Sequence, residues 1–107
     1  MYVQHTYTGV VTELRFAWDP RKAASNRAKH GVTFEEARTA FYDPAALVIA
    51  DPEHSQEEDR FVLLGLSERL RLVVVVHCHR ESSNVIRLIS ARRATRTEQR
   101  QYVERST

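Results

Sequence analysis

Residues 85–98 read VIRLISARRATRTE, an apolar strand that runs directly into two arginines and then into a helix. Thr95 and Glu98 have the spacing of a capping box, in which each side chain bonds the other residue's backbone N–H. We therefore expect Glu98 to cap the helix rather than to orient Arg92 through an ion pair. Arg92 and Arg93 would lie beside helix N–H groups, which favour anions. This junction predicts a surface that faces phosphate.

Hydrophobic periodicity and helix signals extend this interpretation to the rest of the chain. Asp19-Pro20 opens a helix that stops at Gly31, and a second capping box, Thr33 with Glu36, opens another. Short connections between the later strands favour an antiparallel meander over parallel crossovers. The predicted elements, in order, are a strand at 14–18, helices at 20–30 and 34–42, strands at 46–50, 60–67, 70–80 and 84–92, and a helix at about 96–105.

This order, β-α-α-β-β-β-β-α, predicts an α+β fold: an antiparallel β-sheet with two N-terminal-side helices and a C-terminal helix. The segment 72–76 is apolar on both faces, so its strand should be central and covered on both sides. We expect the 107 residues to form a single domain. Residues 1–14 show no clear period and are expected to be an extension or a weak edge segment.

Composition narrows the classes of protein. A lone cysteine, no signal-peptide pattern and no apolar run near the ~20 residues that cross a bilayer predict a cytoplasmic protein. Fourteen of the sixteen basic side chains are arginine, whose planar fork suits phosphate and carboxylate. Residues 43–59 hold six acids and no lysine or arginine, whereas 84–107 hold six arginines and two glutamates. These segments are either two solvated surfaces or an acidic loop and a basic face for nucleic acid.

Several basic residues occupy the ends of predicted elements. Arg60 opens a strand whose mouth should lie near Arg92. It either forms a surface ion pair with the acids at 57–59, or the two guanidiniums clamp one phosphate. Lys29 ends the first helix and is a candidate phosphate ligand, while His30 beside it either caps the helix or contacts substrate.

The sequence His77-Cys78-His79 ends the most apolar strand, and alternation places both histidines on one face. Three interpretations are open: the two histidines could bind a metal, they could be partly exposed residues at a strand end, or one could act as an acid or base at neutral pH. No second ligand pair at metal spacing is evident, so we expect neither a metal nor a cofactor. Trp18 fits the core better than a base-stacking platform. Nothing in the chain matches a hydrolase nucleophile elbow, a phosphate loop or a dinucleotide fingerprint.

An ordered series of short motifs extends over roughly residues 16–103. By this series the chain resembles the BrnT family, the toxin halves of bacterial type II toxin–antitoxin pairs. The first fourteen residues depart from the family pattern, in which the Trp-Asp pair falls near the start. The matching residues are Trp18-Asp19-Pro20, Lys22, Asn26, Lys29-His30-Gly31-Val32, Phe34-Glu35-Glu36-Ala37, Phe41, Asp43-Pro44, Arg60, Gly65, Ile89-Ser90-Ala91-Arg92, Ala94 and Glu98.

The resemblance implies a RelE-like fold and an endoribonuclease that halts translation without a metal. It also implies neutralisation by a cognate antitoxin of the ribbon-helix-helix, BrnA-like type. The toxin–antitoxin complex would then bind operator DNA and repress its own operon. For attack of a ribose 2′-OH on phosphorus, we expect Arg60 and Arg92 to stabilise charge and His77 to transfer a proton. Lys29 and Arg93 would hold flanking phosphates.

Two other functions compete with this hypothesis. The first is a non-catalytic nucleic-acid-binding or regulatory module, whose basic helix at 96–105 would track a phosphate backbone. The second is a metal-dependent hydrolase built on His77 and His79. Cleavage products would separate the nuclease from the module, and a strong chelator would separate it from the metal enzyme.

Overall fold

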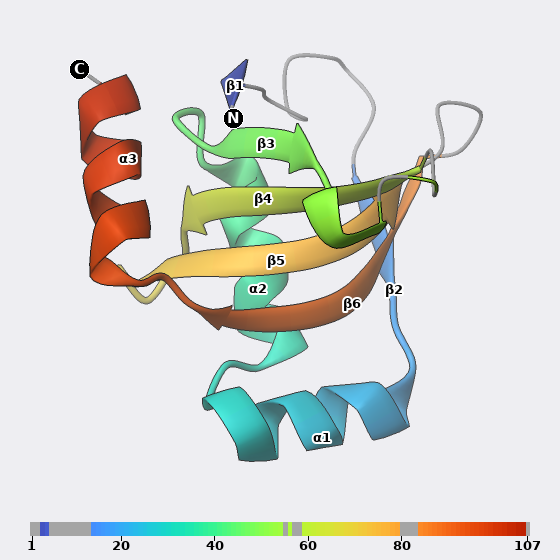
Figure 1. The fold of residues 1–107 in the computed structure, drawn as a ribbon. Helices are drawn as coiled ribbons and strands as arrows, with labels where there is room; N and C mark the ends of the chain where they lie inside the picture. Colours follow the sequence, from blue (N-terminus) through green and yellow to red (C-terminus); the bar gives the residue numbers. More distant parts are fainter. Residues whose placement is uncertain (1–2, 5–13, 55, 57–58, 80–83, 107) are drawn as a thin grey trace.

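In the described part of the chain, six strands form one sheet that three helices flank (Figure 1). The computed structural model describes residues 3–4, 14–54, 56, 59–79 and 84–106. The strands are β1 (Val3–Gln4), β2 (Arg15–Ala17), β3 (Leu47–Ala50), β4 (Arg60–Leu66), β5 (Leu72–His79) and β6 (Val85–Arg93). The helices are α1 (Pro20–His30), α2 (Phe34–Thr39) and α3 (Arg96–Ser106), with short 3-10 turns η1 (Ala40–Tyr42) and η2 (Pro52–His54). The predicted α+β class is confirmed.

The strand order across the sheet is β1-β3-β4-β5-β6-β2. The predicted meander is confirmed, because β3 to β6 pair antiparallel in sequence order. β5 is central, and Val73 to Val75 are buried on both faces. The pairing of β2 was not predicted: it runs parallel to β6, from which two helices and three strands separate it. β1 pairs with β3 at the other edge, and the rest of segment 1–13 lies outside the described residues.

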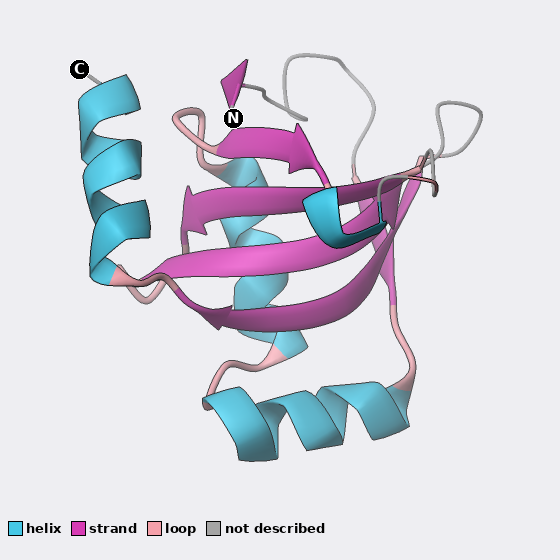
Figure 2. Ribbon diagram, viewed as in Figure 1, coloured by secondary structure: helices cyan, strands magenta, loops and turns pink. Residues whose placement is uncertain are grey.

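Helices cover the two faces of the sheet unequally (Figure 2). α1 and α2 cover the face that we call the helix face, which carries the larger hydrophobic core. Trp18 belongs to this core, since its ring meets that of Phe34 edge-on with centroids 5.9 Å apart. The other face, which we call the open face, is covered by α3 at one end only. There Tyr102 of α3 packs on a smaller cluster of Leu47, Val62, Leu64 and Val74.

One extra residue in β6 changes which side chains point to which face. Successive residues of β5 lie opposite Ser90 and Leu88, which leaves Ile89 unmatched across the ladder. A bulge of this kind adds one residue to one strand of an antiparallel pair. Leu88 before it and Ala91 after it therefore both enter the helix-face core. Simple alternation from Leu88 would send Ser90 and Arg92 to the helix face, whereas the bulge turns them to the open face.

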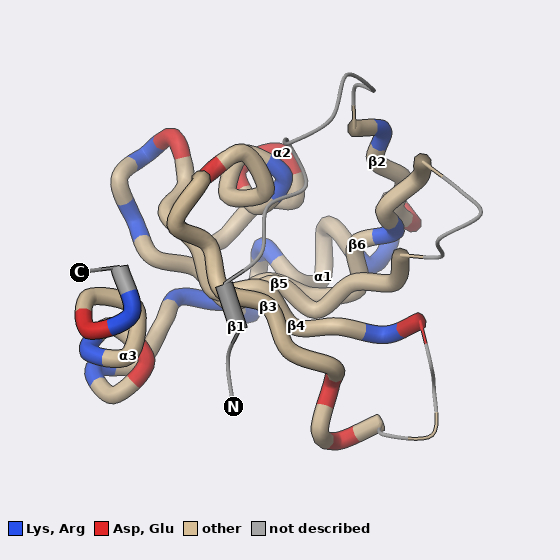
Figure 3. Tube along the Cα trace, turned by 90° about the horizontal axis from the view of Figure 1, so that it is seen from above, with Lys and Arg blue, Asp and Glu red and all other residues tan. Residues whose placement is uncertain are grey.

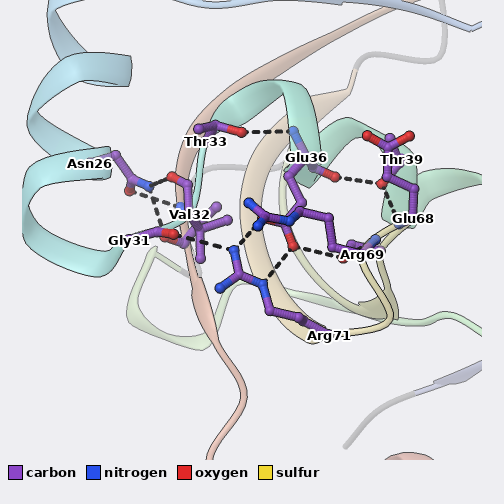
Figure 4. Close-up of polar contacts among 11 residues, drawn as sticks. Asn26, Gly31, Val32, Thr33, Glu36, Thr39, Glu68, Arg69 and Arg71 are labelled. Carbon is purple, nitrogen blue, oxygen red and sulfur yellow. Dashed lines mark hydrogen bonds and ion pairs between the residues drawn. The ribbon is translucent and has the colours of Figure 1, made fainter.

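The predicted capping box at the start of α2 is only half formed (Figure 4). Thr33 Oγ1 accepts the N–H of Glu36 at 3.0 Å, as expected. The Glu36 carboxylate instead accepts Ser67 Oγ at 2.7 Å and Arg71 Nε at 2.9 Å, and it also pairs with Arg71 Nη2. Arg71 donates further to the Gly31 carbonyl at 3.3 Å. The expectation for Glu36 was wrong because a buried carboxylate needs a cation, and the β4–β5 hairpin supplies one.

Gly65 lies on β4 where a side chain would meet η1. A Cβ at this position would lie 2.9 Å from the Ala40 carbonyl oxygen and 3.0 Å from Leu63 Cδ2. The carbonyl belongs to the backbone and cannot rotate away. Gly65→Ala is therefore expected to lower the free energy of unfolding by about 1–3 kcal/mol in urea denaturation. An unchanged unfolding midpoint would show that η1 shifts without cost.

Candidate active site

A cavity of about 410 Å³ lies on the open face, between η2 and α3. We call it the sheet pocket. Its apolar floor comes from β3, β4 and β5, through Ile49, Val62, Val74 and Val76. Its rim is polar except for Pro52 and consists of His30, Asp51, Pro52, Glu53, Arg60, Ser90, Arg92 and Glu98. The two arginines predicted to act together thus line the same pocket.

A buried carboxylate holds Arg60 at the start of β4. Arg60 Nε donates to Asp51 Oδ2 at 2.9 Å, and Asp51 is only 5% exposed. Asp51 also accepts the backbone N–H of Glu53 at 3.0 Å, and its Oδ2 lies 3.2 Å from His54 Nδ1. Burial alone would raise the pKa of Asp51, but its contacts with Glu53, Arg60 and His54 together hold that pKa below the ordinary value. The ionised carboxylate therefore fixes the guanidinium at neutral pH.

Glu98 of α3 holds Arg92 at the other end of the pocket. Arg92 Nη1 and Nη2 donate to the two oxygens of Glu98 at 2.8 and 2.9 Å, a bidentate pair. Glu98 also completes the predicted capping box with Thr95, whose N–H it accepts at 2.8 Å. The expectation that it would only cap was wrong, because two carboxylate oxygens can serve both partners. Arg92 first, and then Thr95, lower the pKa of Glu98 to about 2.

Charge segregation along the sequence is not kept in space. Figure 3 shows the acidic segment after β3 close to the basic start of β4, and α3 carries charges of both signs. Asp51 of the acidic stretch is a carboxylate partner of Arg60. Of the acids expected to pair with Arg60, residues 57–58 lie outside the described part of the chain.

The sheet register separates the two arginines along the pocket. Arg60 lies opposite Cys78 and Arg92 opposite Val74, on either side of β5. Four residues of strand and two strand spacings place their Cα atoms about 16 Å apart. Each side chain is also drawn toward its own carboxylate. This arrangement suits two positions along a bound strand better than the expected clamp on one phosphate.

His77 is not in the sheet pocket. Its side chain is fully buried on the helix face, with ring centroids 4.7 Å from Phe41 and 6.0 Å from Phe61. Its Nδ1 lies 3.1 Å from the Val75 carbonyl oxygen. The prediction that His77 transfers a proton to or from substrate was wrong, because alternation along β5 puts it in the core with Val75. In the described part of the chain, no three His, Cys, Asp or Glu side chains gather as a metal site would require.

The predicted phosphate ligands Lys29 and Arg93 are both exposed and lie outside the pocket lining. Lys29 precedes His30, which does line the pocket at the end of α1. Arg93 follows Arg92 on β6, so alternation points it away from the open face. They therefore flank the pocket rather than form it.

Asn26 of α1 supports the site, and the sequence analysis gave it no role. It is buried, its Oδ1 accepts the N–H of Ala91 at 2.9 Å, and its Nδ2 donates to the Ala91 carbonyl at 2.8 Å. It thus bonds the outer edge of β6 just before Arg92, beyond the end of β2. The available signal was its helical spacing from Ala23 and His30, which puts an amide on the inward side of α1.

Comparison with known proteins places the chain in a family. A family model described as the ribonuclease toxin BrnT of type II toxin–antitoxin systems matches residues 18–98. This chain belongs to the BrnT family. The resemblance drawn from the sequence is confirmed, and the matched range contains every residue that lines the sheet pocket. As a toxin of a type II system, a BrnT protein is a ribonuclease with an antitoxin partner.

A solved structure agrees with the BrnT fold. The 1.1 Å crystal structure of the Brucella abortus ribonuclease toxin BrnT aligns with a TM-score of 0.60 and 24% sequence identity. The alignment covers 78% of this chain and 100% of that one. Among curated proteins, no sequence matches this chain. No helix within the described residues has the length and apolar character needed to span a membrane.

Proposed function

We propose that this BrnT-family chain cleaves RNA by attack of a ribose 2′-OH on the adjacent phosphorus, without a metal ion. One observation carries the proposal: two arginines, each anchored by an ionised carboxylate, line one pocket on the open face. Guanidinium groups that are fixed before substrate binds stabilise the charge that develops on the phosphorane without a reorganisation cost. The ribonuclease activity follows from membership of the family, and the sheet pocket is our candidate for its location.

The floor and the two ends of the pocket would contact different parts of the substrate. Arg60 and Arg92 would contact phosphate oxygens at its two ends, while the apolar floor packs against a base or a ribose. The exposed Lys29 and Arg93 would hold flanking phosphates as the strand leaves the pocket. The carboxylates of Asp51 and Glu98 keep both guanidiniums in place and reduce non-specific attraction to nucleic acid.

The partner and setting follow from the family. The cognate antitoxin would be a ribbon-helix-helix protein of the BrnA type, and the complex would bind operator DNA through the antitoxin. The toxin would act in the cytoplasm, where RNA cleavage inhibits translation. These statements rest on the family resemblance and on the antitoxin partnership that the family name carries.

The reaction can be tested by its products and by its substrate. Purified chain is incubated in excess chelator with an RNA oligonucleotide, and in parallel with ribosome-bound message. We expect products that end in a 2′,3′-cyclic phosphate and a 5′-OH. A matched oligonucleotide with 2′-deoxyribose at the cleaved position should bind but stay intact. Binding without cleavage would select a non-catalytic module, and loss of cleavage in chelator would select a metal-dependent hydrolase.

A further inference from the structure

The proposed reaction needs a group that removes the 2′ proton, and the buried His77 cannot serve. Another histidine, His54, lies beside the pocket rim: it contacts Asp51, which lines the pocket, but it is not itself a lining residue. His54 Nδ1 is 3.2 Å from Asp51 Oδ2, and the same oxygen accepts Arg60 Nε at 2.9 Å. We call these three side chains the rim cluster. The imidazole and the guanidinium therefore share one carboxylate oxygen as acceptor.

The rim cluster holds the imidazole of His54 in a defined protonation pattern. An ionised carboxylate can only accept, so Nδ1 must carry the proton and Nε2 is the basic nitrogen. The 3-10 turn η2 fixes the backbone, since the His54 N–H donates to the Asp51 carbonyl at 3.2 Å. The His54 side chain is 39% exposed, in contrast to His77. His54 is thus both oriented and accessible.

We propose that His54 is the general base of this nuclease, an inference that rests on the proposed function. Nε2 takes the proton of the 2′-OH while the O2′–P bond forms and the P–O5′ bond breaks. The departing 5′ oxygen takes a proton from solvent, and His54 later returns its proton to solvent. The products are a 2′,3′-cyclic phosphate and a 5′-OH, so atoms and charge balance.

The charges around His54 are compatible with this role. The Asp51 carboxylate faces the imidazole, and the Arg60 guanidinium on β4 donates to the same Oδ2. A carboxylate that orients a histidine and stabilises its protonated form is the arrangement used in hydrolytic triads. Positioned proton transfer of this kind contributes ~10²–10⁴-fold to a rate.

The test compares kcat and KM across pH for the full chain and the variant His54→Gln. We expect kcat to fall by at least ~10²-fold with KM nearly unchanged, and the neutral-pH limb of the profile to disappear. His79→Gln, a histidine at the end of β5 and not part of the rim cluster, is the matched control and should keep both rate and profile. Circular dichroism and thermal unfolding establish that His54→Gln is folded, as expected for a partly exposed side chain.

Two further measurements can overturn the assignment. If His30→Gln removes the neutral limb and His54→Gln keeps it, the base is His30. A substrate with sulfur at the 5′ leaving position needs no acid, so the His54→Gln defect should persist on it; a defect that vanishes there makes His54 the acid. In both cases the cyclic-phosphate product and the inert deoxy substrate would still support the proposed function, which fails only if those tests fail.

Discussion

Arg92→Ala is expected to lower RNA cleavage by roughly 10²–10³-fold and to abolish growth arrest when the chain is expressed alone. The guanidinium faces the sheet pocket and is held there by Glu98, so its removal takes away a phosphate contact that is fixed in advance and positions the strand. The fold should survive, because the side chain is 42% exposed and Glu98 keeps its contacts with Thr95. Cleavage of an RNA oligonucleotide in single turnover measures the loss.

Two companion variants sharpen this result. Arg92→Lys keeps the charge but lacks the planar fork that pairs with Glu98, so we expect an intermediate rate. Arg100→Ala removes an exposed arginine of α3 outside the pocket lining and should cleave at the unmodified rate. Antitoxin binding should be nearly intact in all three. A folded, fully toxic Arg92→Ala protein would remove Arg92 from the site.

Arg71→Ala is expected to lower the free energy of unfolding by about 3–5 kcal/mol, because it strands a buried carboxylate. Glu36 is only 3% exposed, and Arg71 is its cationic partner. The loss should fall at the lower end of the range, since Arg71 itself is 23% exposed and water can reach the gap. Urea denaturation at neutral pH gives the difference, with the exposed Arg100→Ala on α3 as the control near zero.

The pH dependence of this loss identifies its cause. The hydrogen bond from Arg71, helped by Ser67 and opposed by burial, holds the pKa of Glu36 below 4.5. In the unmodified chain this stabilisation is complete above the unfolded pKa and is lost as pH falls through the folded one. Without Arg71, burial raises the pKa instead. The deficit of Arg71→Ala should therefore begin to shrink above pH 4.5, as Glu36 of the variant takes up a proton, and shrink further below pH 4.5 as the unmodified chain loses its own stabilisation. A constant deficit would point to lost packing.

The parts of the fold that sequence predicts are those with local causes. Asp19 and Gly31 cap α1 as expected, because both caps act within a few residues. Short loops make the β3–β6 meander predictable for the same reason. The parallel pairing of β2 with β6 is a contact between distant segments, and no turn specifies it. Glu36 shows the same limit, since a local capping box lost to a partner 35 residues away.

In the candidate site too, the residues with local sequence signals were predicted, and those that depend on contacts between distant segments were not. Arg60 and Arg92 were found because each stands at the end of an apolar strand. That both arginines lie on the same face of the sheet could not be derived from the sequence, because strand patterns alone do not show which face the helices cover. His77 was misplaced for that reason: its side chain alternates onto the covered face. The pairing of Asp51 with Arg60 was missed, because the sequence of an acidic segment does not show which of its carboxylates becomes buried.

The unmatched Ile89 makes the chemistry of β6 depend on a residue count. A deletion of one residue there would leave nearly the same amino acids but rotate the following part of the strand by half a turn. Ala91 would then point to the open face, and the guanidinium of Arg92 would point into the hydrophobic core beneath α1 and α2. The position of Arg92 at the pocket therefore depends on the length of β6 as well as on its residue types.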